Sequence, residues 1–171
     1  MNIHPLFVHF PIALLAIYAV LELVRIKKIK DFTAWIYIKA SFLFVGVAGA
    51  LASLETGESA AEFHRDQSEL VRMHETFSQL TTAIFLILGI RYFFVVVDKL
   101  FGEKIRSSKC QKFWSNSLIF VTKIFSGWLL VALALVGVTG LVITGALGGT
   151  IVYGPDMDPI TTFVNKLLFA K

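Results

Sequence analysis

The sequence predicts an all-α membrane protein, a four-transmembrane-helix bundle that forms one domain over residues 1–171. With 56% hydrophobic residues and a mean hydropathy of +0.74, the chain has more apolar residues than a soluble domain of this length needs to build its core. Four apolar segments also reach the length of roughly 20 residues that a helix needs to cross about 30 Å of hydrocarbon. Because apolar and polar residues do not alternate along these segments, we expect helices rather than the strands of a barrel.

The four predicted spans cover residues 5–24, 34–54, 74–97 and 124–146. The first should stay in the protein as a helix, because its basic residues follow the apolar run instead of preceding it as in a signal peptide. After the second span we expect a short outer helix from about Glu58, capped by Thr56. Asp66 and Glu69 have the spacing of a capping box that would start the third helix before the membrane.

The segment after the fourth span, GALGGTIVYGPDMDP, is apolar but rich in glycine, so we expect it to leave the helix and fold back over the outer mouth of the bundle. An amphipathic helix over residues 159–169 should follow on the outer surface, capped by Asp158 with Pro159 at its first position. Its apolar side chains recur with helical spacing at Ile160, Phe163, Val164, Leu167 and Leu168.

Lysine and arginine indicate the orientation, because short cytoplasmic loops carry an excess of them. The first and third connections hold most of the basic residues, namely Arg25, Lys27, Lys28, Lys30, Lys99, Lys104, Arg106, Lys109 and Lys112. The second connection is acidic and should therefore lie outside. In a protein with four spans the two termini lie on the same side as the second connection, so both should face outward. The net charge of +4 therefore indicates topology and contact with anionic lipid, not binding to nucleic acid.

All four histidines, His4, His9, His64 and His74, fall on the side assigned to the outside. Imidazole is costly near hydrocarbon and suits a haem iron or another metal, so this shared placement suggests a site. His9 and His74 are our candidate axial pair, and His4 and His64 are alternates or supporting groups. A CxxCH motif is absent, so a haem would be b-type and non-covalent.

The alternatives for these residues are structural. His4 can sit at the interface, His64 can be solvated, and His9 and His74 can hydrogen-bond between helices. Glu75 is placed to orient a ring nitrogen of His74.

The glycines of the second and fourth spans have the same ambiguity. They permit close helix packing or room for a flat macrocycle, which aromatic residues would line. The glycines are Gly46, Gly49, Gly127, Gly137, Gly140 and Gly145, and the aromatic candidates are Phe7, Phe10, Phe77 and Trp128. No internal repeat stands out in the linear sequence.

Two charged residues lie deep in the first and third spans. Glu22 is 18 positions beyond His4 and Arg91 is 17 beyond His74, which places each roughly 26 Å along its helix. An ion pair between Glu22 and Arg91 would offset the cost of burying both. The alternative is that each side chain reaches the cytoplasmic interface separately.

Four motifs resemble the bacterial membrane-protein family catalogued as domain of unknown function 2231: HPLFVHFPIALL, TGESAAE, MHE and GALGGTIVY. The resemblance spans most of the chain and implies a small four-helix protein of the bacterial inner membrane. Relatives occur fused to or beside cytochrome-type domains, which favours respiratory electron transfer, although the family has no settled activity. Tyr153, at the end of the last motif, joins Glu75 as a candidate supporting residue.

We therefore expect a haem b or redox-metal protein that transfers electrons at the outer face, with a cytochrome or other redox protein as its partner and the bilayer around it. An accessory subunit is favoured over a stand-alone enzyme. One alternative is a structural or assembly subunit without a cofactor. Another is a copper- or zinc-handling protein that uses His4, His9, His74 and Glu75, with Met73 for copper.

The predicted orientation can be tested at the single cysteine, Cys110, in the third connection. A thiol reagent that cannot cross the membrane should leave Cys110 unmodified in intact cells and label it after lysis. A cysteine introduced by Asp156→Cys in a Cys110→Ser background should be labelled in intact cells. Labelling of Cys110 from outside would reverse the placement of every histidine.

Overall fold

The computed structural model describes residues 4–30, 32–61 and 68–169, and these residues form helices joined by short turns. The elements are α1 (His4–Leu23), α2 (Lys27–Lys30), α3 (Trp35–Ala61), α4 (Ser68–Arg106), α5 (Gln111–Ile124), α6 (Gly127–Tyr153) and α7 (Pro159–Phe169). Helices α1, α3, α4 and α6 are long and apolar enough to cross a membrane. The chain is a multi-pass membrane protein, and the predicted fold class is confirmed.

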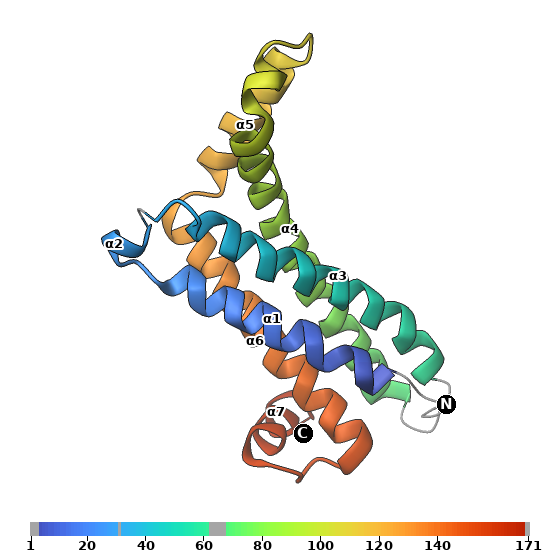
Figure 1. The fold of residues 1–171 in the computed structure, drawn as a ribbon. Coiled ribbons are helices and arrows are strands. Elements are labelled where there is room, and N and C mark those ends of the chain that lie inside the picture. Colours follow the sequence, from blue (N-terminus) through green and yellow to red (C-terminus); the bar gives the residue numbers. More distant parts are fainter. Residues whose placement is uncertain (1–3, 31, 62–67, 170–171) are drawn as a thin grey trace.

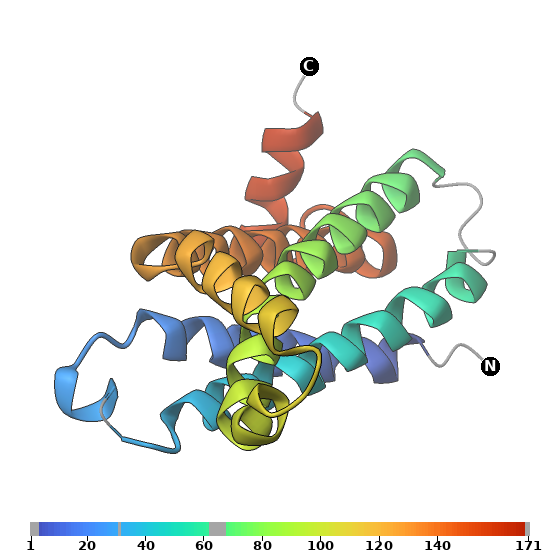
Figure 2. The same ribbon diagram turned by 90° about the horizontal axis from the view of Figure 1, so that it is seen from above.

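The four long helices pack as two pairs, α1 with α3 and α4 with α6 (Figure 1). The pairs are joined where α3 contacts α4 and where α1 contacts α6. The first turns of α1 and α4 and the last turns of α3 and α6 lie at one end of the bundle, which we call the histidine end. At the opposite end α4 continues beyond the bundle and turns back into α5, so we call it the hairpin end (Figures 1 and 2).

The buried core draws its side chains from all four long helices. Tyr18 of α1 is fully buried and lies edge-on to Phe85 and Tyr92 of α4, with ring centroids 6.2 and 5.6 Å apart. Leu43 of α3 and Ala134 of α6 are buried beside them. This apolar layer separates the histidine end from the hairpin end.

Glycines allow the paired helices to approach each other closely. A Cβ atom on Gly46 would lie 2.6 Å from Cδ2 of Leu15, and one on Gly137 would lie 2.7 Å from Cζ of Phe85. Both distances are too short for real atoms, so the space beside each glycine is occupied by a side chain of the facing helix. At Gly46 and Gly137 the structure therefore shows close packing, which is one of the two roles expected for the glycines.

The ends of α3 and α6 correct two of our predictions. Thr56 does not cap a separate outer helix, because α3 runs through it to Ala61 and its hydroxyl donates to the carbonyl of Ala52 at 3.1 Å. Nor does the glycine-rich segment after residue 145 leave the helix, since α6 continues to Tyr153. Close packing against the neighbouring helix outweighs the weak helix propensity of glycine there.

The remaining predictions concern the starts of α4 and α7. Helix α4 begins at Ser68, one and a half turns before His74, as expected, although Asp66 of the predicted capping box lies outside the described residues. Helix α7 is confirmed with its cap: Asp158 Oδ1 accepts hydrogen bonds from the backbone N–H groups of Ile160 and Thr161 at 2.8 and 3.0 Å.

Helix α5 was missed by the sequence analysis, which placed only a basic loop before the fourth span. Its signal is present in the recurrence of Trp114, Leu118 and Val121 on one side of a helix. The indole of Trp114 stacks near Phe94 at 4.9 Å and donates to Asp98 at 3.2 Å, which fixes α5 against the extension of α4.

Close packing at Gly137 predicts a large effect for a small change. Gly137→Ala should lower the free energy of unfolding by about 1–3 kcal/mol, because the rigid ring of Phe85 cannot move aside without disturbing the core. Gly145→Ala in the same helix is the matched control, since a Cβ there meets no atom within 4 Å. It should be neutral or stabilise the helix by up to about 1 kcal/mol. Unfolding of the detergent-solubilised protein by SDS, followed by circular dichroism, measures both; equal effects would contradict the packing role.

Candidate functional site

His4 and His74 come together at the histidine end of the bundle. His4 begins α1 on the helix face that carries the buried Leu15 and Tyr18, and His74 lies on the face of α4 that carries the buried Phe85. Both side chains are partly buried. His4 lies against Gly57 of α3 and His74 against Gly148 of α6.

The ring of His74 is held by α6. Its Nδ1 lies 3.0 Å from the backbone carbonyl oxygen of Thr144. A carbonyl only accepts hydrogen bonds, so Nδ1 carries the proton and donates it. Gly148, one turn further along α6, lies against the ring, since a Cβ there would be 3.2 Å from Cε1 of His74.

The ring of His4 is held by α3 in a similar way. Its Nδ1 lies 3.1 Å from Oγ1 of Thr56. The Thr56 hydroxyl also lies within hydrogen-bond distance of the carbonyl oxygens of Ala52 and Ser53, at 3.1 and 3.2 Å, so it ties His4 to the end of α3. Gly57 lies against this ring, with a would-be Cβ 3.4 Å from Cε1. Partial burial lowers the pKa of His4, which favours the neutral imidazole.

This arrangement orients both imidazoles for ligation. When an oxygen atom holds Nδ1–H, the ring carries its lone pair on Nε2, and the hydrogen bond fixes the ring plane and raises the basicity of that nitrogen. Histidines that ligate metals almost always have such a partner. For His74, the hydrogen bond to the Thr144 carbonyl therefore places the lone pair on Nε2.

The other predicted histidines are placed differently. His9 is exposed and lies two and a half turns before Tyr18, on the opposite face of α1 from the core. The histidine on the inward face of α1 is thus His4 and not His9. His64 lies outside the described residues. Glu75 is exposed, and its carboxylate accepts a hydrogen bond from Gln79 on its own helix at 3.2 Å. The predicted role of Glu75 in orienting the His74 ring is therefore taken by the Thr144 carbonyl.

Several further candidates lie away from the histidine pair. Tyr153 is 72% exposed at the end of α6. Trp128 begins α6 at the hairpin end, 5.6 Å from the guanidinium of Arg25, so it cannot line a site at the other end. Within residues 4–30, 32–61 and 68–169, no three His, Cys, Asp or Glu side chains are grouped so that they could share a metal ion.

A buried charged cluster lies towards the hairpin end. Lys39 Nζ donates to Oε2 of Glu22 at 2.9 Å, and the hydroxyl of Tyr92 donates to the same carboxylate. Glu22 is only 3% exposed. The predicted Glu22–Arg91 ion pair is replaced by this one, because Arg91 donates through Nε to the carbonyl of Phe125 at 2.8 Å. The visible signal for this ion pair is Lys39, a charged residue inside the second predicted span.

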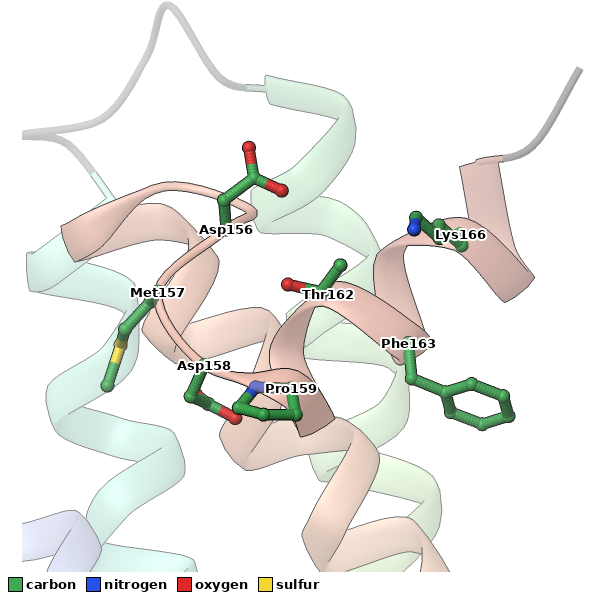
Figure 3. A pocket seen from close by; sticks show the side chains of 7 residues that line it. All are labelled: Asp156, Met157, Asp158, Pro159, Thr162, Phe163 and Lys166. Atoms are coloured by element: carbon green, nitrogen blue, oxygen red, sulfur yellow. The ribbon is translucent and has the colours of Figure 1, made fainter.

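An open groove of about 550 Å³ lies along the start of α7 (Figure 3). Its seven lining side chains include Asp158, which is engaged as the helix cap, and Phe163 and Lys166. The groove is shallow and solvent-facing, and it lacks a buried polar group that would define a ligand.

Comparison with family models finds no match for this chain. Searches of the curated proteins and of the solved structures also find none. The resemblance noted from the four sequence motifs thus stays a resemblance, and the site is interpreted from its own geometry.

The buried ion pair can be tested by a double-mutant cycle. Glu22→Gln should destabilise the wild-type protein more than it destabilises a Lys39→Met background, with a coupling of about 0.5–3 kcal/mol, because either single change leaves the other charge buried without a partner. Arg91→Met is the control background, in which coupling to Glu22 should be clearly smaller. Stronger coupling to Arg91 than to Lys39 would restore the partner expected from the sequence.

Proposed function

We propose that this chain is a membrane-embedded redox protein that holds an imidazole-ligated metal centre, haem b or a redox-active metal ion, between His4 and His74. It would act as an electron-transfer or accessory subunit and not as a stand-alone enzyme. The observation that carries the proposal is the shared geometry of the two rings. Both lie at one end of the bundle and bond to oxygen atoms of the neighbouring helix: Nδ1 of His4 contacts the Thr56 hydroxyl, and Nδ1 of His74 donates to the Thr144 carbonyl, which places the lone pair of His74 on Nε2.

The same geometry changes the choice of ligands. The sequence favoured His9 with His74, but His9 lies on the outward face of α1. His4 is partly buried on the inward face, at the same end of the bundle as His74. We therefore take His4 and His74 as the ligand pair, with Thr56 and the Thr144 carbonyl as the groups that orient them.

The proposed location is the outer face of a bacterial inner membrane, with both termini outside. The basic residues near the α4–α5 turn support this orientation, because they lie at the hairpin end, away from the histidines. A metal centre at the outer face would exchange electrons with a cytochrome or another redox protein there. The motif resemblance supports the same partner class.

A second candidate function is structural. The hydrogen bonds His4–Thr56 and His74–Thr144 each join two long helices, which is what a cofactor-free assembly subunit would use its histidines for. In that case His4→Ala and His74→Ala should each cost about 0.5–1.5 kcal/mol of stability and alter no bound group.

Metal loading separates these functions. Purified protein in detergent is saturated in turn with haem b, copper and zinc, passed through gel filtration, and examined by absorption spectroscopy and elemental analysis. We expect wild-type protein to retain haem or copper, and His4→Ala and His74→Ala to weaken retention by more than about tenfold. His9→Ala is the matched control, the same residue type on the outward face of α1, and should bind as wild type does.

Two results would contradict the proposal. If wild-type protein retains none of the three, the structural function takes its place. If His9→Ala abolishes binding while His4→Ala does not, the ligand pair is the one expected from the sequence.

A further inference from the structure

The surroundings of the two histidines correspond at several positions of the helix that follows each, although Thr56, which hydrogen-bonds His4, corresponds to Leu147 in the second pair. Each ring packs on a glycine of the following long helix, His4 on Gly57 and His74 on Gly148. Four residues before that glycine, a backbone group of each helix hydrogen-bonds the ring: His4 bonds to the backbone of Ser53, and His74 donates to the carbonyl of Thr144. The two contact positions are four residues apart in both α3 and α6, so the helices align here without an insertion.

The match continues away from the histidines. Pro11 packs on Gly49, and Thr81, at the same distance from its histidine, packs on Gly140. In the next turn, Leu15 fills the space beside Gly46 just as Phe85 fills the space beside Gly137. The sequences around these glycines are nearly the same, VGVAG in α3 and VGVTG in α6. Together with the histidine contacts, this gives the same ladder of contacts in both helix pairs.

The burial pattern repeats in the same register. The inward positions of α1 and α4 follow one spacing, and all of them are buried: Pro11, Leu15, Tyr18 and Glu22 in α1 and Thr81, Phe85, Leu88 and Tyr92 in α4. The contacts between the pairs follow the same correspondence: exchanging the two pairs turns the α1–α6 contact into the α4–α3 contact, and both are present. In a two-fold arrangement each such contact has to occur twice.

We propose that α1–α3 and α4–α6 are two copies of one helical hairpin, related by a pseudo-two-fold axis along the bundle, and that the outer site lies on this axis with His4 and His74 as equivalent ligands. This deepens the proposed function and rests on it for the ligand. Equivalent residues meet each other only near a two-fold axis. Glu22 and Tyr92 occupy equivalent positions and are hydrogen-bonded, which marks the axis at one end, and His4 and His74 occupy equivalent, partly buried positions at the other end.

The ligand class follows from this equivalence. Two like imidazoles on opposite sides of an axis suit a metal that accepts identical ligands from two directions, such as the iron of a planar macrocycle. In membrane proteins built from repeats, binding sites lie at the interface between the repeats. The hairpin end has lost the equivalence, because Lys39, which pairs with Glu22, corresponds to Leu130 in the second copy.

A test that needs no metal uses the ring nitrogens of protein labelled with ¹⁵N-histidine, observed by NMR in detergent. Both His4 and His74 should be neutral with the proton on Nδ1. Gly57→Ala should shift the signals of His4 alone, and Gly148→Ala those of His74 alone, because each new methyl group contacts one ring, at 3.4 Å for His4 and more tightly, at 3.2 Å, for His74. Gly145→Ala, with open space around it, should shift neither.

A second measurement tests the ligands. Haem titrated into His4→Ala and into His74→Ala should give the same five-coordinate spectrum in both, with affinities within about twofold of each other. Added imidazole should restore the six-coordinate spectrum in both variants.

The outcomes separate the two proposals. If wild-type protein binds no haem but both histidines show the matched Nδ1–H state and matched responses to their glycines, the duplication stands and the haem function fails. If haem binds and only one of the two variants loses it, the function stands and the equivalence fails. Different ring states for His4 and His74 in metal-free protein would overturn the equivalence outright.

Discussion

Close packing of helix backbones at glycine is the contact on which the rest of this structure depends. In hydrocarbon, apolar side chains gain nothing by leaving lipid for protein, so helices associate through close-fitting surfaces and hydrogen bonds. Leu15 beside Gly46 and Phe85 beside Gly137 provide the fit. Because the helices approach so closely, the ring of His74 reaches the Thr144 carbonyl one turn from Gly148. The geometry of the histidine end is therefore a consequence of packing along the whole length of each pair.

The two ends of the bundle meet the cost of buried polar groups in different ways. At the histidine end, the partly buried rings of His4 and His74 hydrogen-bond to oxygen atoms of α3 and α6. At the hairpin end, a full charge on Glu22 is buried, and it needs both the ammonium of Lys39 and the hydroxyl of Tyr92. The apolar layer around Leu43 separates them. A redox centre at the histidine end would thus be insulated from the charged cluster by a dry core.

Hydropathy and helix caps were enough to predict the four spans and α7, because apolar length and the Asp158–Pro159 start are local signals. The ends of α3 and α6 were not predictable, since whether glycine breaks a helix depends on the neighbour that packs on it. The pairing of Glu22 with Lys39, and the inward placement of His4 instead of His9, depend on helix rotation. Apolar residues surround α1 on all sides, so its sequence does not reveal which face meets the bundle.

The proposed function depends on His4 and His74 acting together as one ligand pair. The most direct measurement is the spectrum of wild-type protein loaded with haem, compared with its His4→Ala, His74→Ala and His9→Ala variants. The account predicts a six-coordinate, bis-imidazole spectrum for wild type and His9→Ala, and loss of one axial ligand in each of the other two. A six-coordinate spectrum that survives His4→Ala and disappears in His9→Ala would contradict it.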